Sequence, residues 1–135
     1  MIDIQSVKKV FRYIKIYGLF RTLIKVIGRL RPKIKFWILL KFPFYSSKGK
    51  SVGIVGCGHH AFSSIAYYLC SKTNSKISFA LDVDTSASSS LAYAYNAMDI
   101  GASYDNNKDR VNAPDIVYIS SNHASHTDYA IQFLK

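Results

Sequence analysis

Hydrophobic residues at the start of the chain recur every three or four positions, the spacing of one face of a helix. Over residues 4–17 they are interleaved with lysine and arginine, and the same pattern returns over residues 19–30. Pro32 cannot continue a helix, so the second helix should end there. An apolar piece over residues 33–42 and a polar linker over 45–50 complete a predicted helical arm.

From residue 51 onward, short apolar runs alternate with helical stretches. Runs at 51–55, 76–82 and 116–120 have the composition of buried parallel strands, and a short third strand is expected at 102–104. Helices are expected from about His60, from Thr85 as the N-cap to Tyr95, and from Ser125 to Leu134, with a turn or one helical turn over 106–112. This alternation predicts an α/β fold: a partial Rossmann, doubly wound parallel sheet of about four strands, preceded by the arm.

The charge of the chain is concentrated in the arm. Residues 1–50 hold 13 of the 18 lysines and arginines and a single acid, so they carry +12, whereas the remaining residues carry −2. We therefore expect a basic amphipathic extension over 1–49 and a nucleotide-binding domain over 50–135. Basic amphipathic helices suit either an anionic membrane surface or a partner protein. Nucleic acid is disfavoured, because the arm has no base-reading or RNA-stacking motif.

A glycine-rich turn follows the first predicted strand. Gly56, Gly58 and Ala61 occupy the fixed positions of a G-x-G-x-x-A pattern. Gly56 permits the tight turn, Gly58 leaves room for a pyrophosphate, and Ala61 lets the next helix pack closely on the sheet. Asp82 ends the next strand at about the spacing, roughly 20 residues, where a carboxylate meets a ribose. These features predict a dinucleotide site; a strand-to-helix turn without a ligand is the alternative.

Polar residues follow the last predicted strand. Positions 120–126 read SSNHASH. Ligands of open parallel sheets bind outside the carboxyl ends of the strands, at the point where the strand order reverses. The first and fourth predicted strands flank that point. The glycine turn and the 120–126 segment should therefore face one crevice.

The cysteines, the adjacent histidines and the hydropathy of the chain bear on its cellular compartment and on metal binding. Cys57 and Cys70 form neither a disulfide framework nor a zinc pattern, so a reducing cytoplasm is expected. His59 and His60 are adjacent and should point apart, which disfavours a metal site. The longest unbroken apolar run in the arm, 36–40, is far shorter than the ~20 residues that span a bilayer. The arm would still permit a peripheral position at the inner face of the membrane.

Three segments together resemble the N-terminal domain of the Gfo/Idh/MocA oxidoreductases. They are VGIVGCG at 52–58 with Ala61, ALDVD at 80–84, and VYISSN at 117–122 followed by His126 and Ala130. The resemblance covers roughly residues 50–135. It implies an NAD(P)-dependent oxidoreductase that moves a hydride between the nicotinamide and a carbon of a sugar, polyol or nucleotide-sugar.

The resemblance also implies roles for individual residues. The pyrophosphate would lie against Gly56, Gly58 and the backbone at His59 and His60, the adenosine ribose at Asp82, and the nicotinamide side near Ser120, Ser121, Asn122 and His126. Val83, rather than an arginine, follows Asp82, so nothing obvious would neutralise a 2′-phosphate. The expected cofactor is NAD, with NADP as the alternative.

The sequence departs from the family pattern at its C-terminus. The E-K-P segment, whose lysine assists proton transfer, and the substrate domain that should follow it are not in the 135 residues. The expectation is a C-terminally truncated oxidoreductase that is inactive alone. A non-catalytic nucleotide-binding module, docked through residues 1–45 to a membrane or partner, is the alternative. A methyltransferase also uses a glycine loop and an acid, but the G-x-G-x-x-A turn and the SSNHASH segment disfavour it.

Overall fold

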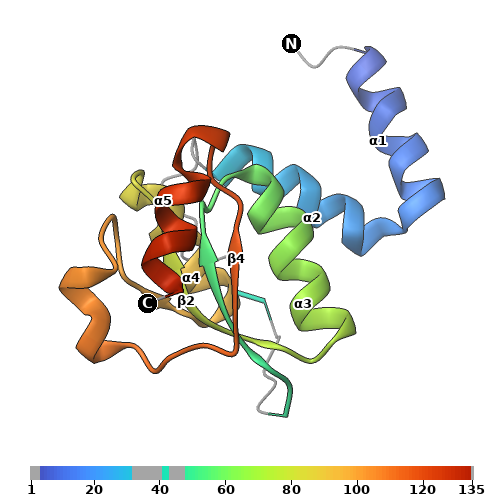
Figure 1. Cartoon of the computed structure of the whole chain (residues 1–135). Helices are drawn as coiled ribbons and strands as arrows, with labels where there is room; N and C mark the ends of the chain where they lie inside the picture. The colour runs from blue at the N-terminus through green and yellow to red at the C-terminus, as the bar shows by residue number, and fades with distance from the viewer. Residues whose placement is uncertain (1–3, 32–40, 43–47, 135) are drawn as a thin grey trace.

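A parallel sheet forms the centre of the molecule. The computed structural model describes residues 4–31, 41–42 and 48–134, so residues 33–40 of the predicted apolar piece and 45–47 of the linker lie outside the described residues. The strands are β1 (Ser51–Val55), β2 (Lys76–Leu81), β3 (Met98–Asp99) and β4 (Ile116–Ile119), in the order β3-β2-β1-β4 (Figure 1). All pair in parallel, which confirms the predicted α/β class.

The two faces of the sheet are covered by different helices. Val52 and Ile54 of β1 belong to a buried cluster with η3 (Ala61–Ala66), α3 (Tyr67–Lys72) and α4 (Thr85–Tyr95). Val55 faces the other way, into a cluster that includes residues of α5 (His123–Phe133). Because side chains alternate along a strand, the apolar run of β1 supplies both cores at once. β1 is therefore an interior strand, with β2 and β4 on its two sides.

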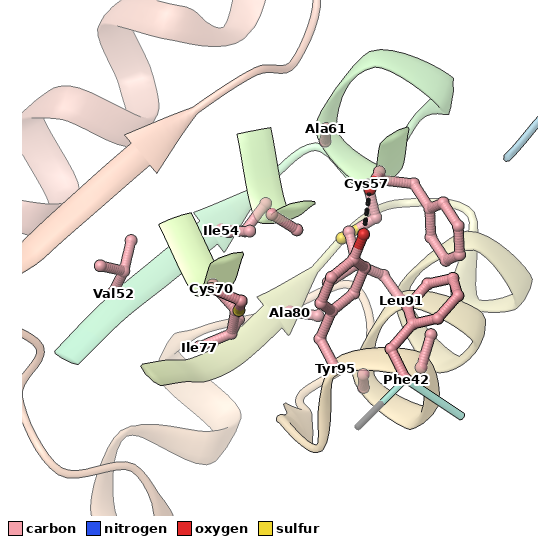
Figure 2. Packing of buried hydrophobic residues seen from close by; sticks show 14 of the residues in the cluster. Phe42, Val52, Ile54, Cys57, Ala61, Cys70, Ile77, Ala80, Leu91 and Tyr95 are labelled. Carbon is pink, nitrogen blue, oxygen red and sulfur yellow. Dashed lines mark hydrogen bonds between the residues drawn. The ribbon is translucent and has the colours of Figure 1, made fainter. Parts of the chain in front are cut away.

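Three aromatic rings close the larger core (Figure 2). The ring of Tyr95 lies 5.2 Å from that of Phe42 and 5.4 Å from that of Phe62, both in edge-on geometry. The Tyr95 hydroxyl donates a hydrogen bond of 2.6 Å to the backbone oxygen of Phe62. Burial raises the pKa of this phenol, so it remains a neutral donor. The arm thus contributes Phe42 to the core of the domain.

Three sequence-based boundaries were wrong. The third strand is Met98–Asp99 rather than 102–104, since the Asp99 carboxylate accepts hydrogen bonds from Ser88 and from the Gly101 N–H and turns the chain there. Asp84, not Thr85, caps α4, because its carboxylate reaches two free N–H groups of the first turn. α5 begins at His123 rather than Ser125, with Asn122 as its cap. The predicted helical turn after β3 is η4 (Asp105–Arg110), a 3₁₀ helix.

The first two helices form a hairpin on the outside of the domain. α1 (Ile4–Tyr17) and α2 (Leu19–Leu30) have the bounds that the periodicity predicts, and Gly18 joins them with φ of 83°. α2 packs on η3 (Figure 1). A Cβ on Gly28 would lie only 3.0 to 3.2 Å from side chains of residues 59, 62 and 63, so this glycine permits the close approach of the two helices.

Arg21, on the buried face of α2, attaches the hairpin to the domain. Arg21 is 8% exposed, donates to the backbone oxygen of Ser63, and lies over the rings of Tyr67 and Tyr68 at 4.6 Å. Guanidinium groups stack well on aromatic faces, which allows this charge to be largely buried. The buried face of α2 is therefore held by polar contacts as well as by Ile24, which is 0% exposed.

Candidate functional site

A cleft of about 420 Å³ opens at the carboxyl ends of the central strands. Its walls come from the turn after β1, the end of β2, and the β4–α5 connection. The lining residues are Gly56, Gly58, Asp82, Val83, Ser120, Ser121, Asn122, Ser125 and Tyr129. This is the crevice at the reversal of strand order, where ligands of such sheets bind.

The two glycines of the turn are required for different reasons. Gly56 has φ of 86°, and a Cβ there would lie 2.5 Å from the backbone nitrogen of Ser121. It therefore allows both the left-handed turn and the close approach of the β4 loop. Gly58 has no heavy atom within 4 Å of the corresponding Cβ position. The space above Gly58 is open and belongs to the cleft.

Asp82 connects the glycine turn to the end of β2. Its Oδ2 accepts a hydrogen bond of 2.5 Å from the backbone N–H of Cys57, and its Oδ1 accepts one of 2.9 Å from the N–H of Asp84. A carboxylate has about four lone-pair sites, so each oxygen can accept a further donor. The carboxylate is partly exposed and lines the cleft. It is held in place and still able to bind a hydroxyl.

The polar segment after β4 forms the opposite wall. Asn122 caps α5 by accepting from the N–H of Ser125 at 3.1 Å, and the Ser125 hydroxyl lies 2.9 Å from that of Ser121. His126 contacts the backbone oxygen of Ser121 through Nε2 at 2.7 Å. His126 does not line the cleft. Its hydrogen bond to Ser121 therefore fixes the loop and does not present the imidazole to a ligand.

Arg31 supports the glycine turn from behind. It is 3% exposed and donates to the backbone oxygen of Cys57, and its guanidinium lies 4.3 Å from the ring centre of Phe62. Burial lowers the pKa of Arg31, an effect that the charge of Asp82 partly offsets. No sequence pattern indicates this role, because Arg31 is one of many basic residues in the arm.

The chemistry of the cleft is that of binding. Burial, with the charge of Asp82, raises the pKa of the Cys57 thiol from 9.0 to about 12, so the thiol is neutral and a poor nucleophile at physiological pH. Among the described residues that line the cleft, none is a lysine, histidine or glutamate. The hydroxyl, amide and carboxylate groups present are suited to hold a polar ligand.

The predicted site residues divide into two groups. Six line the cleft together: Gly56, Gly58, Asp82, Ser120, Ser121 and Asn122. His59, His60 and His126 do not line it, and both His59 and His60 are exposed. Val83 and Tyr129 also line the cleft and were not predicted, and Ser125 lines it as part of the 120–126 segment expected there but without an individual role. Ser125 and Tyr129 lie three or more positions into a helix, so only the packing of α5 brings them here.

Fold and cleft together define a class of protein. A parallel sheet with a glycine turn after β1, an acid at the end of β2 and a polar cleft at the switch point is a Rossmann domain of the dinucleotide-binding type. The chain belongs to the Gfo/Idh/MocA oxidoreductases: the model of this oxidoreductase family, with its NAD-binding Rossmann fold, matches residues 50–135. This match confirms the resemblance that the motifs indicate.

Further comparisons and searches gave no additional relatives. Neither the curated proteins nor the solved structures contain a significant match.

Within the described ranges, no three His, Cys, Asp or Glu side chains come together as a metal site. None of the helices built from those residues is long and apolar enough to cross a membrane.

Proposed function

We propose that residues 50–135 bind NAD in the cleft and form the cofactor domain of an enzyme that transfers hydride to or from a sugar, polyol or nucleotide-sugar. One observation carries the proposal: the open space above Gly58 and the partly exposed carboxylate of Asp82 lie in a single cleft. A pyrophosphate needs close access to backbone N–H groups, and a ribose needs an acceptor for its hydroxyls. The cleft offers both.

The groups that line the cleft indicate which part of the reaction it would support. The bound cofactor supplies the hydride, while the protein must place the substrate and move a proton. Among the described residues, the lining offers no lysine, histidine or glutamate, and its titratable side chains are Asp82 and Tyr129. The proposal assigns cofactor binding to this cleft and substrate contacts to groups outside it.

Preference for NAD over NADP is part of the proposal. Asp82 is an anion at the ribose position, and its repulsion of a 2′-phosphate would disfavour NADP. Val83, 78% exposed, stands beside it and offers the phosphate no positive charge. We expect NADH to bind about tenfold more tightly than NADPH. One unfavourable charge contact that costs about 1.4 kcal/mol of binding free energy changes the dissociation constant by this factor.

Titration calorimetry of the full chain with NADH and NADPH, beside an Asp82→Ala variant, tests this function. The variant should weaken NADH binding by roughly tenfold or more, because a charged hydrogen-bond acceptor for the ribose is lost. Asp109→Ala is the matched control, since Asp109 is exposed in η4 and does not line the cleft. Failure of a folded parent chain to bind either cofactor would refute the proposal, as would equal NADH affinity in all three proteins.

A further inference from the structure

The hairpin of α1 and α2 exposes an unusual amount of apolar surface. Six of the hairpin's apolar side chains that are at least 40% exposed are here called the apolar ridge: Ile4, Val7, Phe11, Leu19, Leu23 and Leu30. Ile16, Tyr17 and Phe20 are also at least half exposed, on other faces of the two helices. Phe11 is 68% exposed and Leu23 47%. Exposed apolar side chains in this number on a folded protein generally mark an interaction site.

The two halves of the apolar ridge lie on one side of the hairpin. The helices meet across a groove lined by Ser6, Lys9, Val10 and Tyr13 of α1 and by Thr22, Lys25, Val26 and Arg29 of α2. At about 100° per residue, the ridge lies about a quarter turn beyond the groove in α2 and about two fifths of a turn beyond it in α1, in the direction of winding in both helices. Because α2 turns back from α1 at Gly18 (Figure 1), offsets in the same direction of winding bring the two halves toward the same side of the helix pair.

That side of the hairpin faces away from the domain. Ile24 and Gly28 are buried against η3, and they lie between about 100° and 160° from Leu23 and Leu30 around α2. The apolar ridge is therefore not the surface that attaches the hairpin to its own domain. It is free to meet something outside the described part of the chain.

The charges beside the ridge indicate what it meets. Apart from Arg21 and Arg31, which are buried against the domain, residues 4–31 contain lysine or arginine at positions 8, 9, 12, 15, 25 and 29 and no aspartate or glutamate. Lys8 and Lys15 lie four positions after Ile4 and Phe11, so they border the ridge on the surface of α1. Their long aliphatic stems can lie along an apolar surface while the ammonium groups reach anionic groups at its edge.

We propose that the α1–α2 hairpin docks this protein on an anionic phospholipid surface, with the apolar ridge in the acyl boundary and the bordering lysines at the lipid phosphates. A bilayer presents an apolar interior under a continuous layer of negative charge, which matches an apolar ridge with Lys8 and Lys15 at its border. A protein partner would have to bring acids to every bordering position. The cofactor cleft is built from other elements, so docking and cofactor binding are separable.

Vesicle flotation of the full chain tests the docking. The probes are vesicles of phosphatidylcholine alone and vesicles with about one third phosphatidylglycerol, at low and high salt. The parent chain should float with the anionic vesicles, and less so at high salt, because screening weakens the lysine contacts. Each lysine near an anionic surface contributes about 1 kcal/mol, so Lys8→Gln with Lys15→Gln should weaken binding roughly 10- to 30-fold.

A second pair of variants tests the apolar ridge. Phe11→Asp with Leu23→Asp should abolish flotation, while Ile131→Asp is the control, since Ile131 is 50% exposed on α5 outside the hairpin. Melting temperatures should be unchanged in all of them, because the altered side chains are exposed, and this separates lost docking from lost folding.

Three results would overturn the proposal: no flotation of the parent chain, equal flotation with neutral vesicles, or no loss in the ridge variant. A dimer that the ridge variant dissociates, without vesicle binding, would assign the ridge to a second copy of the chain instead.

Discussion

At the residue scale, two glycines of one motif perform separate tasks. Gly56 shapes the backbone, because its positive φ and its closeness to Ser121 leave no room for a side chain. Gly58 shapes the cleft, because its neighbourhood is empty. The G-x-G pattern predicted glycine at both positions for these reasons, and the local geometry is the one each reason requires.

Alanine substitutions separate these two tasks. Gly56→Ala should lower the free energy of unfolding by about 3 kcal/mol or more, since both the backbone conformation and the contact with Ser121 are strained. Gly58→Ala should change it by less than about 0.5 kcal/mol, yet weaken NADH binding by roughly tenfold because the methyl group fills the phosphate space. Thermal unfolding and calorimetry measure the two effects. Similar stability losses in both variants would contradict this division.

At the element scale, α2 shows how one short helix serves two surfaces. Arg21, Ile24 and Gly28 recur at helical spacing and are buried against the first helix of the domain. Leu19, Leu23 and Leu30 recur at the same spacing on another face and remain exposed. The sequence predicted the helix and its bounds, but its apolar periodicity did not single out the two arginines and the glycine that lie in the buried contact.

Enlarging the residue at the helix contact tests the packing of α2. Gly28→Leu should destabilise the protein by about 2 kcal/mol, because the new side chain must displace neighbours that already lie close to a Cβ position. Leu23→Ala, on the exposed face, should change stability by less than about 0.5 kcal/mol. Chemical denaturation of both variants gives the comparison. An unaltered unfolding midpoint in Gly28→Leu would mean that α2 is not packed as described.

At the scale of the whole molecule, the arm and the matched domain share a core. Ile24 and Phe42 precede residue 50, yet both belong to the buried cluster formed with β1, η3 and α4. Phe42 also donates its backbone N–H to Ala94 at 2.9 Å, so the chain before the family domain is tied to the helix that follows β2. The stability of residues 50–135 therefore depends on residues that the family match does not include.

Truncation of Phe42 measures this dependence. Phe42→Ala should cost about 3 to 5 kcal/mol, as removal of a buried aromatic side chain leaves a cavity beside Phe62 and Tyr95. Urea denaturation with Phe20→Ala as the control distinguishes a core role from a surface one, since Phe20 is 50% exposed. A loss no greater than the control's would show that the domain folds without help from the arm.

The sequence by itself determined the α/β class, the parallel sheet, the two arm helices and six residues of the cleft. These follow from local patterns: apolar periodicity sets element type, and the glycine and acid positions are fixed by the backbone of one βαβ unit. The sequence could not determine the two-residue β3, the capping role of Asp84 or the support of the glycine turn by Arg31. Each depends on a contact between segments distant in the chain or on competition between neighbouring polar groups. Only the tertiary structure decided which charges are buried and which apolar side chains remain exposed, because burial depends on what each face of a helix meets.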